Sequence, residues 1–182
     1  MTIKTPVMEN VVNGLAAVAC ARLFNISFLK IAAGLRRAKF QQGRQQIERM
    51  HGYTVINDSY NANPLSFRSA LRTLQNFPTK GRRIVVCGDM LELGKRSKAL
   101  HQELGVLIGE AGVIDAVYSF GSLAGSIAQA AKKIRPEIDM KQYRKIDALQ
   151  RDLKRALVKN DVVLVKGSRG MRMERVTNFL RA

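Results

Sequence analysis

Three polar, glycine-bearing loops hold the side chains of this chain that could do chemistry. Each loop follows a hydrophobic run, and the loops read NDSYNANP at 57–64, GDMLELG at 88–94 and KGSRGMRMER at 166–175. In an open parallel sheet the carboxyl ends of the strands meet at one edge, and the helices that follow point their amino termini toward it. The sequence therefore predicts the functional site in these three loops.

The first loop has the residues of a turn that could bind a sugar or a nucleotide. Asn63 followed by Pro64 is a good N-cap before a residue suited to the first helical position, so the loop opens a helix whose free amides face the strand ends. Beside that positive terminus, Asp58 or Asn61 could hold a sugar hydroxyl, and Tyr60 could stack on a base. Asp58 and Asn61 are also common turn formers, and on composition alone this structural alternative is favoured.

The third loop resembles an anion cradle. Lys166 emerges from the hydrophobic run DVVLV, and the residues from Gly167 to Gly170, which include Ser168 and Arg169, allow close backbone approach before a helix. Binding of a phosphate or carboxylate and a simple strand-to-helix turn are both compatible with this string. It is not a Walker A loop, because that motif needs GxxxxGK followed by Ser or Thr, and no such string occurs in the sequence.

Other reactive side chains give weaker signals. In the second loop, Asp89 and Glu92 could position an amine or a cation, and a solvated acidic turn is the alternative. Cys20 and Cys87 have no CxxC spacing and are interpreted as small core or loop residues, with Cys87 the more reactive of the two because of its place near a strand end. His101 has no second histidine or carboxylate at ligand spacing, so a structural role is favoured.

Strand, polar loop and helix alternate from residue 53 onward. We expect strands at 53–56, 83–87, 116–120, 140–143 and 162–165, and helices that begin near residues 64, 97, 122 and 171. A further helix follows the strand at 140–143, where Asp147 and Gln150 resemble a capping box. This alternation predicts an α/β protein with a Rossmann-like three-layer α/β/α arrangement, a mostly parallel sheet and helices on both faces.

A small helical segment precedes that fold. Residues 10–22 place apolar side chains at helical spacing, and Ser27 can cap a second helix that runs through Leu35. The polar stretch 38–49 reads as a linker that leads into a short strand, and residues 51–52 as a hairpin turn.

The net charge of +17 and the pI near 10.6 invite a nucleic-acid interpretation, because Lys and Arg side chains that neutralise phosphates drive non-specific binding. The charges are spread along the chain, however, and no aromatic-interleaved ribonucleoprotein motif, zinc-finger spacing or arginine-rich tail accompanies them. A basic surface without a dedicated nucleic-acid face is therefore favoured. A basic module that binds nucleic acid or another polyanion on a Rossmann-like scaffold stays open as the alternative.

Length and hydropathy indicate a globular protein. With 182 residues, 46% of them hydrophobic, the chain is long enough for one domain with a well-buried core and a separate small N-terminal piece. No apolar stretch approaches the roughly 20 residues of a membrane span, and residues 1–7 lack the features of a signal peptide. We expect a cytoplasmic monomer that neither binds a membrane nor recognises a specific nucleic acid.

The strings DSYNANP, GDMLELG and VLVKGSRGMRMER, in this order and with this spacing, resemble the C-terminal domain of the Mur ligases. The stretch ENVVNGLAAVACA looks like that family's HNVxNALAAxAxA segment, which ends the central ATPase domain. The resemblance implies an ATP-dependent amide ligase of peptidoglycan precursor synthesis. Within the family, the strings look most like the member that adds D-alanyl-D-alanine to UDP-N-acetylmuramoyl tripeptide.

The resemblance also implies roles for individual residues. The positions expected to bind the nucleotide are Asn10, Asn13, Arg44, Asp58, Tyr60 and Asn61. The positions expected to line the dipeptide side of the cleft are Asn63, Asp89, Lys166, Ser168 and Arg169. No catalytic residue and no metal ligand is assigned to this chain.

The same resemblance implies that the chain has two parts and that other domains of the full-length enzyme supply the rest of the reaction. Residues 1–42 correspond to a helical remnant of the ATPase domain plus a linker, and residues 43–182 to the C-terminal domain. ATP and Mg²⁺ belong to the full-length family enzyme, and we expect this chain alone to hold neither. The UDP-binding domain and most of the ATPase domain, with its phosphate loop, are expected as missing partners, so the chain alone should not catalyse ligation.

Overall fold

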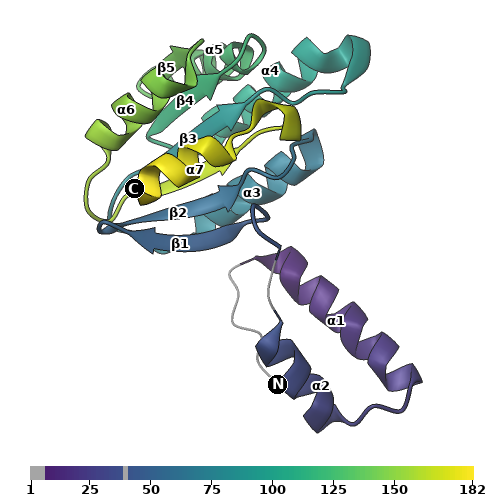
Figure 1. Cartoon of the computed structure of the whole chain (residues 1–182). Helices are drawn as coiled ribbons and strands as arrows, with labels where there is room; N and C mark the ends of the chain where they lie inside the picture. Colours follow the sequence, from purple (N-terminus) through teal and green to yellow (C-terminus); the bar gives the residue numbers. More distant parts are fainter. Residues whose placement is uncertain (1–6, 39–40) are drawn as a thin grey trace. The chain divides into compact units, whose positions relative to one another are not determined.

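The computed structural model describes residues 7–38 and 41–182, and it divides the chain into two compact units, Met1–Gln41 and Gln42–Ala182 (Figure 1). Parts of the predicted helical segment and linker, residues 1–6 and 39–40, lie outside the described residues.

The first unit is a pair of helices, α1 (Met8–Leu23) and α2 (Phe28–Arg37). Ser27 caps α2, because its side chain accepts a hydrogen bond from the Lys30 amide, as the sequence predicted. The first helix is three residues longer than expected, and the second ends two residues later than expected. Several large apolar side chains at the α1–α2 turn are exposed, among them Leu23 and Phe24.

The second unit is built on a six-stranded sheet in the order β1-β2-β6-β3-β4-β5. Its strands are β1 (Gln46–Met50), β2 (Tyr53–Asp58), β3 (Arg83–Gly88), β4 (Ala116–Phe120), β5 (Asp139–Tyr143) and β6 (Val162–Lys166). Only β1 runs antiparallel to its neighbour, while the other four pairings are parallel. The predicted mostly parallel sheet is confirmed.

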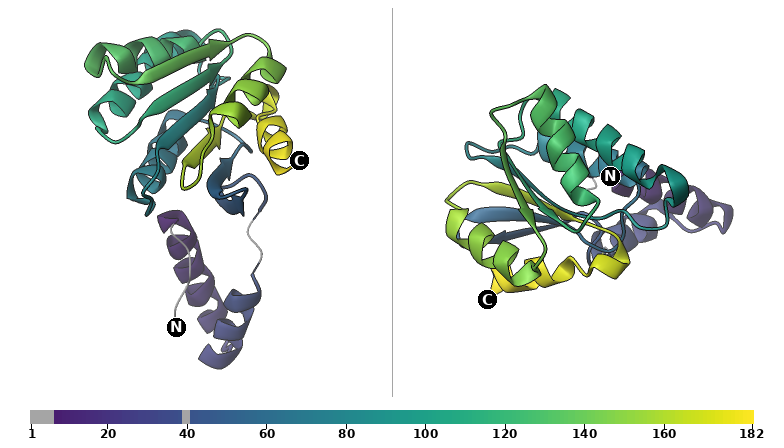
Figure 2. Two further views of the ribbon diagram at one scale, coloured as in Figure 1. Left: turned by 90° about the vertical axis from the view of Figure 1, so that its left-hand side faces the viewer. Right: turned by 90° about the horizontal axis from the view of Figure 1, so that it is seen from above.

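Helices cover both faces of this sheet (Figures 1 and 2). One face packs against α3 (Pro64–Asn76), α4 (Ser97–Glu110) and α5 (Ala124–Ile134), and the other against α6 (Ile146–Ala156) and α7 (Glu174–Arg181). Neighbouring residues of a strand enter opposite cores, as their alternating direction requires. In β2, for example, Ile56 belongs to the core under α3 and Val55 to the core under α6 and α7. The three-layer α/β/α prediction is confirmed.

The predicted linker was wrong at its carboxyl end. Residues 46–49 belong to β1, where Ile47 pairs with Ile56 across an antiparallel hairpin. The hairpin turns through His51, with φ of 49°, and Gly52, with φ of 86°, so the predicted turn is confirmed. A polar strand at the edge of a sheet lacks the hydrophobic run by which central strands are recognised, and this explains the error.

Two helix starts also differ from prediction. The proposed capping box of Asp147 and Gln150 is absent, because α6 begins after Lys145 without a side-chain cap, and the Gln150 amide donates instead to the Arg175 carbonyl. The last helix begins at Glu174, later than expected. Residues 169–171 form a 3₁₀ turn, η2 (Arg169–Met171), before it.

None of the helices in the described part of the chain is both long and apolar enough to cross a membrane.

A bidentate ion pair fastens the edge strand to the last helix. The Arg181 guanidinium donates to both carboxylate oxygens of Glu48, with Nε 2.6 Å from Oε2 and Nη2 2.8 Å from Oε1. The hydrogen bond from Arg181, followed by one from Asn57, lowers the pKa of Glu48 against the opposing effect of burial. A carboxyl whose pKa is lower when folded contributes stability above its unfolded pKa, and that contribution is lost as the pH falls through the folded value.

We therefore predict that Glu48→Gln lowers the free energy of unfolding by about 1 kcal/mol at neutral pH. The difference from wild type should shrink as the pH falls below 4.5, because Glu48 is then protonated in the unfolded chain and increasingly in the folded one. Urea denaturation across this pH range measures it. Glu103→Gln is the control, since its pair with Arg96 is solvent-exposed, and an equal loss there would contradict the prediction.

Candidate functional site

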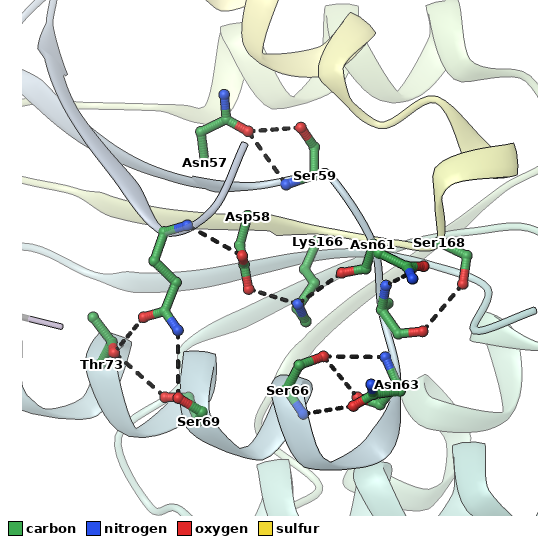
Figure 3. Close-up of polar contacts among 12 residues, drawn as sticks. Asn57, Asp58, Ser59, Asn61, Asn63, Ser66, Ser69, Thr73, Lys166 and Ser168 are labelled. Carbon is green, nitrogen blue, oxygen red and sulfur yellow. Dashed lines mark hydrogen bonds and ion pairs between the residues drawn. The ribbon is translucent and has the colours of Figure 1, made fainter. Parts of the chain in front are cut away.

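The register of the parallel strands brings the first and third loops together. Asp58, the last residue of β2, is the direct partner of Lys166, the last residue of β6, and Lys166 also pairs in register with Cys87 of β3. The three predicted loops therefore leave the sheet from adjacent strands at one edge. Figure 3 shows the polar contacts between the first and third loops.

A buried ion pair lies at the centre of this edge. The Lys166 ammonium donates to Asp58 Oδ2 at 2.6 Å and to the Asn61 carbonyl at 2.9 Å, and the Asp58 Oδ1 atom accepts from the Gln45 amide at 3.1 Å. The Lys166 side chain is 1% exposed. Burial raises the pKa of the Asp58 carboxyl and lowers the pKa of the Lys166 ammonium, because desolvation opposes both charges more than their mutual attraction favours them.

A second buried group, the Ser168 hydroxyl, joins all three loops. It donates to the Ala62 carbonyl at 3.2 Å and accepts from the Leu91 amide at 2.8 Å, while the Ser168 amide donates to the Asp89 carbonyl. The dipeptide contacts expected of Lys166 and Ser168 remain predictions. Both side chains are buried, and their polar atoms hold the loops in place.

Asp89 has a structural role as well. Its carboxylate accepts hydrogen bonds from the amides of Ser122, Leu123 and Ala124 at the start of α5. Gly121 permits this approach, since a Cβ there would lie 2.5 Å from Asp89 Oδ1. Both carboxylate oxygens bond to the amino terminus of this helix, and the dipeptide contact expected of Asp89 remains a prediction.

Asn63 is the predicted N-cap of α3. Its side chain accepts from the Ser66 amide at 2.8 Å, and the Ser66 hydroxyl accepts from the Asn63 amide, which completes a capping box. Asn61 is exposed and its Oδ1 accepts from the Ala62 amide. The side-chain oxygens of Asn61 and Asn63 thus accept hydrogen bonds from nearby main-chain amides, as the structural alternative predicted. A dipeptide contact by Asn63 would compete with its role as the cap of α3.

The exposed part of the site is an aromatic ring with two arginines. The Arg44 guanidinium carbon lies 4.3 Å from the centroid of the Tyr60 ring, and that of Arg169 lies 5.5 Å from it. Both arginines are exposed and Tyr60 is half-buried. Gly43, with φ of 72°, sets the path of the chain here, because its carbonyl accepts from the Tyr60 amide at 2.9 Å. The sequence suggested that the Tyr60 ring stacks on a base, whereas in the structure the guanidinium groups of Arg44 and Arg169 lie over the ring.

Gln45 is a site residue that sequence reasoning missed. It adopts a positive φ of 47°, its amide donates to Asp58, and its side chain bonds to Ser69 and Thr73 of α3. The only local signal for this turn is the preceding Gly43. Nothing in the sequence indicates that the amide of Gln45, two residues later, donates a hydrogen bond to the Asp58 carboxylate.

Asn10 and Asn13 lie on α1 in the first unit, where Asn10 is half-buried and Asn13 exposed. The loop residues belong to the second unit, and each unit is described by itself. Their nucleotide contacts therefore remain predictions.

The second loop is held by a neutral imidazole. His101 Nε2 accepts from the Met90 amide at 2.9 Å, so the ring proton is on Nδ1, which donates to the Ser97 carbonyl at 2.7 Å. The structural interpretation of His101 is confirmed. In the part of the chain that the structure describes, no three His, Cys, Asp or Glu side chains gather as metal ligands would.

Comparison with known proteins adds a family to this geometry. The model of the family "Mur ligase, glutamate ligase domain" matches residues 43–169. The UDP-N-acetylmuramoyl-tripeptide--D-alanyl-D-alanine ligase of Bacillus subtilis is 34% identical over 173 residues, which cover 94% of this chain and 38% of that protein. Its Escherichia coli counterpart is 35% identical over 179 residues, covering 97% and 38%.

Solved structures agree with these relatives. A crystal structure of MurF from Acinetobacter baumannii superposes with a TM-score of 0.80 at 29% identity, covering 93% of this chain and 37% of that one. MurF ligase from Thermotoga maritima, in complex with ADP, gives a TM-score of 0.66 at 34% identity, covering 81% and 32%. The chain thus spans little more than a third of the length of the proteins that it matches.

The structure corrects the expectation that Cys87 is the more reactive cysteine. Cys87 is fully buried in β3, and burial raises the pKa of its thiol to about 12, whereas Cys20 is exposed. We predict that a thiol reagent modifies only Cys20 in the folded chain at mildly alkaline pH. Mass spectrometry of the labelled peptides measures this. Modification of Cys87 at the rate found in denaturant would contradict the burial described here.

A double-mutant cycle tests the buried ion pair. Lys166→Met should lower the free energy of unfolding by about 3–5 kcal/mol, because the buried Asp58 carboxylate loses its partner. Adding Asp58→Asn should recover part of that loss, since an amide tolerates burial without a counter-charge. Urea denaturation of the two single variants and the double variant measures the coupling. Lys98→Met, on an exposed lysine, is the control, and additive losses at Asp58 and Lys166 would contradict a direct interaction.

Proposed function

Since this chain belongs to the Mur ligase family, we propose that it is the C-terminal part of an ATP-dependent ligase that adds D-alanyl-D-alanine to UDP-N-acetylmuramoyl tripeptide. The relatives named for that activity support the choice of substrates. The observation that carries the proposal is the pair of exposed arginines, Arg44 and Arg169, over the half-buried Tyr60 ring, in the loops that the buried Asp58–Lys166 pair holds together. A fixed cationic surface at the carboxyl ends of parallel strands suits a phosphate-bearing ligand.

The nucleotide side of this proposal rests on Arg44 and Asp58. A carboxylate has about four acceptor positions, and two of those on Asp58 are filled by Lys166 and Gln45, so a ribose hydroxyl can still donate to it. The Arg44 guanidinium can donate to the phosphates. Asn10 and Asn13 would meet the adenine edge, and this part of the proposal rests on family resemblance alone.

The dipeptide side of the proposal centres on Arg169, which is exposed and can pair with the carboxylate of the incoming dipeptide. Lys166, Ser168, Asp89 and Asn63 are proposed to line the same side of the cleft while they hold the loops and cap α3. Asn61, which is exposed, can offer its side-chain amide nitrogen to the nucleotide.

ATP, when bound, supplies the activation of the peptide carboxylate that makes amide formation possible. The described residues gather no set of metal ligands, so we assign none of them to Mg²⁺. The contribution proposed for this chain is binding and orientation of the nucleotide and of the incoming amine.

We further propose that the protein acts in the cytoplasm, where ATP and UDP-linked precursors are found, and as a monomer that works with UDP-binding and ATPase domains. The alternative of a nucleic-acid or polyanion module is not supported, because the relatives named above are ligases.

A fusion tests the proposed function. Residues 1–182 would replace the matching part of the Bacillus subtilis relative, whose upstream domains supply the rest of the enzyme. We expect release of ADP that requires both UDP-N-acetylmuramoyl tripeptide and D-alanyl-D-alanine, and a loss of at least about tenfold on Asp58→Ala. A fusion that folds but shows no such activity, beside an active native enzyme, would overturn the assignment.

A further inference from the structure

A basic groove lies at the amino ends of the parallel strands, at the opposite edge of the sheet from the three loops. It has a volume of about 940 Å³, and Thr54 of β2 and Arg83 of β3 are among the residues that line it. Thr54 lies four residues before Asp58 on β2, so about 13 Å of strand separates the groove from the buried ion pair. Small-molecule sites typically have volumes of roughly 300–1,000 Å³. The groove is therefore large enough for a small ligand of its own.

The lining of this groove is cationic. Arg49, Lys80 and Arg83 are positively charged at neutral pH, and His51 is a fourth basic residue of the lining. Within the described ranges 7–38 and 41–182, neither Asp nor Glu lines the groove, and no carboxylate forms an ion pair with any of these four side chains. The lining thus carries three fixed positive charges and no negative one.

The carboxylates near the groove in sequence are already bonded elsewhere. Glu48 forms its bidentate pair with Arg181. Asp161 is buried, and its Oδ2 atom lies 2.6 Å from Arg82 Nη2. Asp115 accepts from the main-chain amide that begins β3, at 2.7 Å. The first two are compensated by their own arginines, so they offset little of the positive charge in the groove.

The carboxyl end of α3 disfavours an anion, and Arg83 offsets this effect. Phe77 and Pro78, which follow the helix, line the groove, and a helix carboxyl terminus carries a partial negative charge. Arg83 Nε donates to the Leu74 carbonyl at 3.2 Å, and Nη2 donates to the Phe77 carbonyl at 3.0 Å. These bonds use two of the five N–H groups of the guanidinium, so others can donate to a ligand.

Hydrogen bonds tie together the three turns that surround the groove. The Asn160 amide donates to the Gly52 carbonyl at 2.8 Å, which joins the turn before β6 to the β1–β2 hairpin. The Thr79 hydroxyl donates to the Asn160 carbonyl and accepts from the Gly81 amide at 3.0 Å, which adds the turn after α3. The main-chain walls of the groove are therefore in place before a ligand arrives, and this lowers the entropic cost of binding.

We propose that this groove binds a phosphate-bearing small molecule, with Arg49, Lys80 and Arg83 as its cationic contacts. A phosphate group carries up to two negative charges at neutral pH and offers several acceptor oxygens, so it can pair with more than one cation at once. A guanidinium matches the phosphate with parallel N–H donors. The groove shares no residue with the loops used by the proposed function, so the two proposals stand separately.

NMR titration of the 182-residue chain with pyrophosphate tests the site. At about 0.15 M salt, where non-specific attraction is screened, we expect saturable shifts of the Gly52, Gly81 and Asn160 amides. Arg49→Ala combined with Lys80→Ala should weaken binding at these amides by at least about tenfold. Both side chains are exposed, so the double variant should fold. Absent shifts, shifts that do not saturate, or shifts confined to the three loops at the other edge would overturn the proposal.

A matched variant separates the groove from net charge. Arg151→Ala combined with Arg155→Ala removes the same charge from exposed positions of α6. Its affinity for pyrophosphate at the groove should stay within about twofold of wild type, because exposed charges more than a Debye length away are screened. A loss equal to that of the groove variant would show that overall charge attracts the probe, and the groove would then not be a site.

A second variant adds a charge to the groove and leaves its cations in place. Asn76 lines the groove and is exposed, so Asn76→Asp introduces a carboxylate there and should weaken pyrophosphate by about fivefold. Gln102→Glu adds the same charge at an exposed position of α4 and should have little effect. Equal effects of the two substitutions would contradict binding in the groove. Activity of the fusion with the upstream domains decides the ligase assignment independently.

Discussion

The carboxyl edge of the sheet depends on one buried ion pair. Parallel register makes Asp58 and Lys166 direct neighbours at the ends of β2 and β6, and a charge in either position would be costly without the other. The same ammonium also holds the Asn61 carbonyl, so the first loop leaves its strand along a fixed path. A shift of either strand by one residue would separate the two charges and turn the side chains that follow to the opposite face.

Around that pair the site has a buried layer and an exposed layer, and the two have different roles. Polar side chains that are buried, such as Ser168 and Asp89, bond to main-chain groups and leave little acceptor or donor capacity for a ligand. The arginines of the site, Arg44 and Arg169, are longer, exposed and cationic. A rigid buried layer that supports a small exposed one is the arrangement by which proteins keep binding groups in position before a ligand arrives.

How far sequence could predict this structure depends on the range of each interaction. The strands β2 to β6, the cap by Asn63 and the hairpin at Gly52 depend on local sequence, and the local pattern of residues indicated them. The hydrogen-bond partners of Asp89 and Lys166 are distant in sequence. The sequence therefore located the loops, but it could not separate the residues that face a ligand from those that hold the loops in place. Gln45 gave no signal, because a positive φ at a glutamine is set by its surroundings.

The bidentate ion pair between Glu48 and Arg181 has a consequence for the connectivity of the second unit. It joins the first strand of that unit to the penultimate residue of the chain, so both ends of the unit meet at one edge of the sheet. Domains whose ends lie close together tolerate circular permutation. The order of the elements along the chain can therefore change without a change in their packing. If the two ends of the unit were joined and new ends were made in an exposed loop far from the site, the order of the strands in the sheet would be preserved.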